Sequence, residues 1–266
     1  MSGIASLRPL AEGARGWVRW QGRVHEVRPH PAGVQLLGGQ VLHEGEFDWL
    51  PALPPLQGRR ARSCFALGLN YADHARELDF KPPSEPLLFL KGANTLCGHR
   101  GQTPRPPGAR HMHYECELVA VIGREARRVS RAQALDHVAG YTIANDYAVR
   151  DYLENFYRPN LRVKNRDACT PIGPWLVPAA QIGDPQGLSL RSWVNGELKQ
   201  SGSTRDMVFG VAELIEYLSG FMTLSPGDLI LTGTPDGVVD CPVGSEVVCE
   251  IDGLGRLHNT IIEGQP

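Results

Sequence analysis

Two glutamates and an aspartate are the residues of this sequence whose types and spacing could bind a metal ion. Glu115 and Glu117 stand two residues apart in HYECELVAVIG (113–123), which has the apolar content of a strand. Side chains alternate across a strand, so both carboxylates would share a face that then turns apolar, where they need a cation. With Asp146 at the end of YTIAND (141–146), they could bind Mg²⁺ or Mn²⁺ through oxygen and leave positions open for water and substrate.

Two other interpretations of these residues stay open at the level of the sequence. An E-x-E pair is common, and the two glutamates could belong to a solvated edge strand that binds nothing. Alternatively, His111, His113 and Glu117 form H-x-H-x3-E, which is similar to a cupin-type site for iron or manganese, metals that imidazole ligands suit. The glycine spacing of such a site is missing, and no later Pro-x-Gly-x-x-His segment supplies a fourth ligand.

Acid–base chemistry could come from a histidine and a glutamate three residues apart. If ADHARELDF is helical, His74 and Glu77 share a face, and a histidine oriented by a carboxylate makes a general base. A solvated surface pair is the competing interpretation. Lys164 would point to solvent unless the fold brings it beside the metal. The TGTPDG turn (232–237) offers N–H groups and the Thr234 hydroxyl to a carboxylate, or it simply closes a hairpin.

The segments that must position these residues are mostly predicted strands. Pairs with the composition of two-residue turns predict hairpins at Gln21-Gly22, Gly38-Gly39 and Asn195-Gly196. Helical spacing is clearest in 206–222, and Ser130 is expected to cap a second helix in 130–140. A proline-rich stretch suggests a linker, so we predict a small N-terminal β domain with its linker over 1–58 and a catalytic domain over 59–266.

Composition and charge narrow the class of protein. The 30 glycines and 21 prolines among 266 residues imply many turns and short strands, not a helix bundle. A net charge of −2 offers no basic surface for nucleic acid. No apolar run reaches the roughly 18 residues of a membrane helix, and the N-terminus lacks a signal-peptide core. The six scattered cysteines form no CxxC pair, as expected for free thiols in a reducing cytoplasm.

Seven segments that occur in order together resemble the fumarylacetoacetate hydrolase family. They are GLNYADHARE, PLLFLK, HYECELVAVIG, GYTIANDYAVRDY, K-x2-D-x2-T-P-I-G-P-W, VNGELKQ and LSPGDLILTGTPDGV, within about residues 63–262. The resemblance implies an α+β, strand-rich fold, the mixed β-roll of that family with few short helices. It also implies dimers, so we expect a homodimer or an assembly with a paralogous subunit.

The resemblance also implies roles for the candidate residues. The three carboxylates would hold Mg²⁺ or Mn²⁺, and His74 with Glu77 would form an acid–base pair. Lys164 would lie beside the metal, and Thr234 of the TGTP turn would hold substrate. A small-molecule carboxylate is therefore the expected partner, and neither nucleic acid nor a membrane is.

Two segments indicate a branch of the family. GLNYADHARELDFKPPSEPLLFLK and NDYAVRDYLENFYRPNLRVKNRD are similar to the branch of homoprotocatechuate (4-hydroxyphenylacetate) degradation. This implies metal-dependent decarboxylation, isomerisation or both of a keto-enol di- or tricarboxylate, with a metal-stabilised enolate whose charge Lys164 shares. Arg150, Arg158 and Arg162 could grip a distal carboxylate, and we select Arg150 for this role.

Two competing functions remain at this point. An acylpyruvate- or fumarylacetoacetate-type C–C hydrolase would need an activated water, yet this chain has Leu153 where many relatives carry a glutamine that helps to hold it. A non-catalytic partner subunit is the other, although such a chain would be free to lose the carboxylates and the His–Glu pair.

Overall fold

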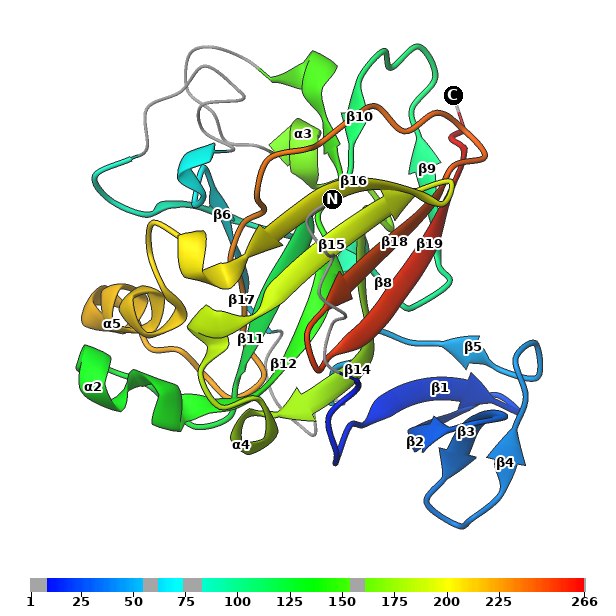
Figure 1. Cartoon of the computed structure of the whole chain (residues 1–266), viewed down its shortest axis with the longest axis horizontal. Helices are drawn as coiled ribbons and strands as arrows, with labels where there is room; N and C mark the ends of the chain where they lie inside the picture. The colour runs from blue at the N-terminus through cyan, green and yellow to red at the C-terminus, as the bar shows by residue number, and fades with distance from the viewer. Residues whose placement is uncertain (1–8, 55–61, 74–82, 154–160, 266) are drawn as a thin grey trace, which may run out of the picture.

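Strands dominate the architecture, as the sequence predicts (Figure 1). The computed structural model describes residues 9–54, 62–73, 83–153 and 161–265. His74, Glu77 and Arg158 lie outside these ranges, and so does the segment 55–61 with the predicted domain boundary. None of the helices in the described ranges is long and apolar enough to cross a membrane. All six cysteines are free thiols.

The N-terminal segment folds into a five-stranded antiparallel sheet of order β4-β3-β2-β1-β5, the blue lobe of Figure 1. Its strands are β1 Gly16–Trp20, β2 Arg23–His30, β3 Gly33–Leu36, β4 Val41–Leu42 and β5 Asp48–Trp49. Both hairpins predicted here are confirmed. Gln21 and Gly22 have φ of 48° and 73°, the left-handed pair that a tight two-residue turn requires.

A seven-stranded mixed sheet of order β7-β6-β17-β11-β12-β14-β8 carries the acidic residues. Its strands are β6 Cys64–Gly68, β7 Leu87–Leu90, β8 Leu96–Cys97, β11 Cys116–Ile122, β12 Val138–Asn145, β14 Thr170–Pro178 and β17 Leu229–Leu231. Every residue of β11 is buried, because neighbouring strands and core clusters cover both of its faces. This excludes the interpretation in which Glu115 and Glu117 belong to a solvated edge strand.

A second five-stranded sheet, of order β16-β15-β18-β19-β9, covers the first (Figure 1). Its strands are β9 Gln102–Arg105, β15 Ser189–Val194, β16 Glu197–Ser203, β18 Glu246–Ile251 and β19 Gly255–Glu263, and a two-stranded ribbon pairs β10 Met112–His113 with β13 Ala148–Val149. Side chains of β11 alternate as expected. Leu118 packs in the cluster that contains Leu190 of the second sheet, and Val119, on the face of Glu117, packs in a cluster with Trp17.

Helices in the described ranges are few and short. Those that lie wholly within these ranges are α2 Arg131–Ala134, α3 Leu161–Lys164, α4 Ala179–Ile182 and α5 Val211–Phe221, with 3-10 turns η1 Ala93–Thr95, η2 Leu135–His137, η3 Arg150–Tyr152, η4 Pro185–Gly187 and η5 Thr204–Asp206. The predicted helix over 206–222 begins only at Val211, because Asn70 binds the N–H groups of Val208 and Phe209. Ser130 stands before α2, but its hydroxyl bonds Gln133 and caps no N–H.

Aromatic rings join the N-terminal sheet to the main body. The ring of Trp49 meets those of Trp175 and His99 edge-on, with centroids 5.2 and 5.1 Å apart. His99 is buried, and its Nδ1 accepts the backbone N–H of His258 at 3.1 Å. Burial, and then the nearby His258 and Arg100, lower the pKa of His99 to about 3. The junction therefore holds His99 neutral.

This junction should make the protein sensitive to acid. The unfolded chain binds a proton near pH 6.5 that folded His99 does not bind, so stability falls as the pH drops from about 6.5 toward 3. Between about pH 7.5 and about pH 5 the wild type should lose about 2 kcal/mol more stability than His99→Asn, because all other groups titrate alike in both proteins. Urea unfolding of both proteins at both pH values measures it, and an equal loss in both would contradict the prediction.

Candidate metal centre

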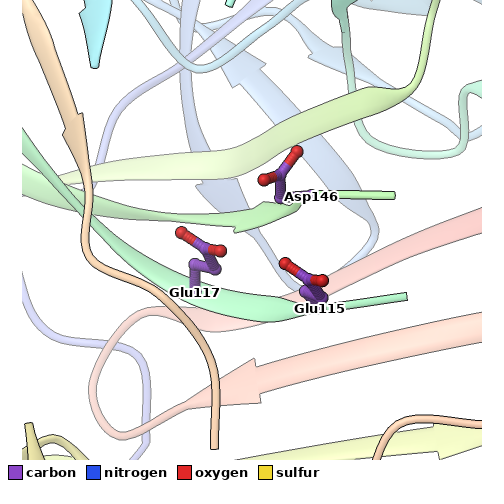
Figure 2. A group of neighbouring side chains, drawn as sticks. All are labelled: Glu115, Glu117 and Asp146. Carbon is purple, nitrogen blue, oxygen red and sulfur yellow. The ribbon is translucent and has the colours of Figure 1, made fainter. Parts of the chain in front are cut away.

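Strand pairing brings the three predicted carboxylates together. Cys116 of β11 pairs with Asn145 of β12, and the N–H of Asp146 donates to the carbonyl of Glu115 at 2.9 Å. Oxygens of Glu115, Glu117 and Asp146 consequently lie within 4.8 Å of one another, and all three residues are buried. Figure 2 shows the two glutamates extending from one strand toward Asp146 at the end of its neighbour.

One carboxylate oxygen indicates that this cluster is built for a cation. Oε2 of Glu117 accepts the N–H of Gly233 at 2.8 Å, whereas Oε1 is buried and has no partner among the described residues. Burial, followed by Asp146 and Glu115, raises the pKa of Glu117 well above its usual range. A buried carboxylate oxygen without a partner is costly, and a divalent ion bound by oxygen would satisfy it. The residues therefore fit Mg²⁺ or Mn²⁺.

Lys164, which the family resemblance implied beside the metal, contacts two residues of the cluster. Its Nζ donates to Oδ2 and to the backbone oxygen of Asp146 at 2.8 and 3.0 Å, and it forms a close ion pair with Glu115. The one-turn helix α3 positions it.

A second lysine, Lys91, was not predicted. Its fully buried Nζ donates to Oδ1 of Asp146. Burial alone would lower the pKa of Lys91, but Asp146 raises it above the usual range, so the lysine is charged. The signal in the sequence is its period: Lys91 comes two residues after Phe89, a buried side chain of β7, and so continues an inward-facing row.

Arg150 also faces the cluster, on the 3-10 turn η3. Its Nη2 donates to Oε1 of Glu115 at 2.7 Å and its Nε to Nδ1 of His113 at 3.2 Å. Burial, and then Arg150, lower the pKa of His113 to about 4, so this ring is a neutral acceptor. His111 is exposed. Neither histidine joins the acidic cluster, and the cupin-type set is not assembled.

Arg162, the other predicted arginine among the described residues, contacts Tyr152 instead of the acidic cluster. Its guanidinium stacks over the ring of Tyr152, 3.8 Å from the centroid. The Arg162 guanidinium therefore forms a cation–π contact with Tyr152.

The TGTP turn closes one side of the cluster. Gly233 has a φ of 83°, and a Cβ there would meet Cβ of Asn70 at 3.0 Å, so the turn needs glycine. Nδ2 of buried Asn70 donates to the carbonyl of Thr232 at 2.7 Å. Thr234, the predicted substrate contact, is buried one residue after the N–H that binds Glu117. Asn70 was not predicted, although its place after β6, in GLNYADH, marks it as a polar residue at a strand end.

Charge at the centre is balanced among the protein groups. Lys91, Lys164 and Arg150 face the three carboxylates, but none of them forms an ion pair with Glu117. A divalent ion would therefore leave a net positive centre, suited to a substrate that brings negative charge. His74 and Glu77 lie outside the described residues. The described chain before them runs to Asp73, and Tyr71 forms a β-bridge with Met207.

Comparison with known proteins gives one consistent result. Residues 63–262 match the family model described as "Fumarylacetoacetate (FAA) hydrolase C-terminal". A 4-hydroxyphenylacetate degradation bifunctional isomerase/decarboxylase of Salmonella dublin is 61% identical over 237 residues, 89% of this chain. The chain spans about half, 55%, of the length of that relative.

Solved structures agree with the sequence comparison. A 5-carboxymethyl-2-hydroxymuconate delta-isomerase from Mycobacterium smegmatis superposes with a TM-score of 0.80 at 33% identity, over 95% of this chain and 100% of that one. A fumarylpyruvate hydrolase from Pseudomonas aeruginosa, in complex with Mn²⁺ and pyruvate, gives 0.73 at 35% identity over 80% and 97%. The predicted strand-rich fold is thereby confirmed.

Proposed function

Because the chain belongs to the fumarylacetoacetate hydrolase family, we propose that it is a metal-dependent enzyme that decarboxylates or isomerises a keto-enol di- or tricarboxylate. The substrate class follows the names of its relatives in 4-hydroxyphenylacetate degradation. The observation that carries the proposal is the acidic cluster with its unpartnered Glu117 oxygen, buried beside two lysines. Such a centre can activate a 2-oxo acid. In a protein that only assembles with a partner, burying these charged groups would cost stability and serve no purpose.

The proposed chemistry assigns a task to each group. Glu115, Glu117 and Asp146 would hold Mg²⁺, which when bound supplies Lewis acidity toward a 2-oxo acid. Lys164, a charged donor in a buried site, would stabilise negative charge that develops on the substrate as CO₂ or a proton leaves. Burial excludes water, which strengthens that interaction.

Other residues would transfer the proton and bind the distal carboxylate of the substrate. We propose that His74, oriented by Glu77, delivers or removes the proton. Arg150 would bind a distal carboxylate, for which its guanidinium has donors beyond those engaged by Glu115 and His113. Loss of CO₂ and a 1,3-proton shift would leave the same charge on the substrate, so one site could serve both reactions.

A spectrophotometric assay tests this function. The purified full chain should release CO₂ from the homoprotocatechuate ring-cleavage tricarboxylate with Mg²⁺ present, and lose that activity in EDTA and in Glu115→Ala. The exposed Glu197→Ala is the matched control and should keep full activity. Cleavage of an acylpyruvate instead would make the chain a C–C hydrolase. Inactivity toward both substrates with Mg²⁺ or Mn²⁺ would favour the partner-subunit hypothesis.

We further propose that the chain forms a homodimer or assembles with a paralogous subunit, in a reducing cytoplasm that suits its six free cysteines. Sedimentation of the purified chain separates assembly with itself from dependence on a second subunit.

A further inference from the structure

Gln200, a buried amide on β16, connects the second sheet to the metal centre. It is fully inaccessible to solvent. Its Oε1 accepts the Ser192 hydroxyl at 2.8 Å and the N–H of Cys116, the residue between the two metal-binding glutamates, at 3.4 Å. Its Nε2 donates to the carbonyls of Pro235 and Asp236 at 2.8 and 3.3 Å. Every hydrogen-bonding atom of this amide is thus used.

These partners fix which way the amide points. The Cys116 N–H is only a donor, so the atom facing it must be the oxygen of Gln200. The Pro235 carbonyl is only an acceptor, so the atom facing it must be the nitrogen. A flipped amide would set two donors against each other on one side and two acceptors on the other.

The fixed amide determines the role of the Thr234 hydroxyl. Nε2 of Gln200 also donates to Oγ1 of Thr234, at 3.0 Å. Thr234 is therefore an acceptor toward Gln200, and its own proton must go elsewhere. Among the residues that the structure describes, no acceptor takes that proton. Thr232 is different, because its hydroxyl donates to the carbonyl of Leu118 at 2.9 Å within the sheet.

Thr234 belongs to the turn that contacts the acidic cluster. The preceding residue, Gly233, gives its N–H to Glu117, so the turn runs along the edge of the cluster. We propose that Gln200 is a positioning residue: it holds the Thr234 hydroxyl so that its proton is donated to the carboxylate of the bound 2-oxo acid. This inference rests on the proposed function, and it adds a residue through which the second sheet controls substrate affinity.

Calorimetry with Mn²⁺ and pyruvate tests the inference on the full chain. Gln200→Met should weaken pyruvate binding to the Mn²⁺-loaded protein about tenfold or more, the scale of one hydrogen bond to a charged group, and Thr234→Val should do the same. The double variant should be no weaker than Thr234→Val, because both changes remove one interaction. Thr234→Ser, which keeps the hydroxyl, should bind within about threefold of the wild type. Mn²⁺ affinity without pyruvate should stay within about threefold throughout, since neither side chain is a metal ligand.

Gln186→Met is the matched control. This amide also bridges backbone groups, accepting from Val211 and donating to Thr204, but at η4. It should leave pyruvate affinity unchanged. Equal pyruvate affinities in Gln200→Met and the wild type, additive losses in the double variant, or a parallel loss of Mn²⁺ affinity would each overturn the role of Gln200. A wild type that binds Mn²⁺ but no pyruvate would instead overturn the proposed function, and this inference with it.

Discussion

Glu117→Gln is expected to weaken Mn²⁺ binding by more than about 100-fold and, at the same time, to make the metal-free protein more stable. Loss of even an outer partner of a metal ligand costs 10–100-fold, and Glu117 is itself a proposed ligand. Without metal, its carboxylate is buried beside Asp146 and Glu115 with one oxygen unpartnered, so removing the charge should stabilise the fold by about 1–2 kcal/mol. Titration calorimetry and urea unfolding in EDTA measure the two effects.

The opposite signs make this test specific. Glu250→Gln is the control, because Glu250 is a partly exposed strand residue paired with Arg256 at 3.1 Å. It should change neither Mn²⁺ affinity nor, by more than about 1 kcal/mol, stability. A Glu117→Gln protein that is less stable in EDTA than the wild type would mean that Glu117 has a structural role, and unchanged Mn²⁺ affinity would exclude it as a ligand.

Lys91→Met should be the most destabilising single change at the centre. Lys91 and Asp146 are both buried and form an ion pair, and removing one partner of such a pair costs about 3–5 kcal/mol, because the other charge stays buried. Mn²⁺ should restore part of this stability, since the ion would neutralise Asp146 in place of the lysine. Urea unfolding in EDTA and in Mn²⁺ gives the two free energies of unfolding.

The control for this prediction is Lys199→Met on β16. Lys199 pairs with Glu197, which is largely exposed, so its loss should cost less than about 1 kcal/mol with or without metal. Equal losses for Lys91→Met in EDTA and in Mn²⁺ would show that the metal and Lys91 do not act on the same carboxylate.

Local rules predicted those features that depend on neighbours in the sequence. Strand alternation placed Glu115 and Glu117 on one face, and the Asn195-Gly196 turn, with φ of 51° and 81°, joins β15 to β16 as expected. The predicted start of α5 was wrong, because the backbone carbonyl and the side chain of the distant Asn70 accept the N–H groups of Val208 and Phe209. Propensity alone does not include these distant contacts.

The partners of the carboxylates could not be derived from local spacing. Lys91 reaches Asp146 only because the sheet folds β7 and β12 around the same centre, and Gln200 reaches Thr234 from the opposite sheet. The family resemblance implied roles for Lys164 and Thr234. Lys91 and Gln200 end two of its motifs, PLLFLK and VNGELKQ, but no role was predicted for either residue. Contacts between strands far apart in sequence are tertiary information, which a single sequence does not show directly.

The pairing of β11 with β12 gives the acidic cluster a second consequence, for assembly of the chain itself. Cys116 faces Asn145, and a slip of the ladder by one residue would send Asp146 to the opposite face from Glu117. A chain that paired these two strands in the wrong register would lack the proposed ion site. If the cluster binds an ion, metal would therefore stabilise only the correctly registered fold, because a ligand stabilises the state that binds it.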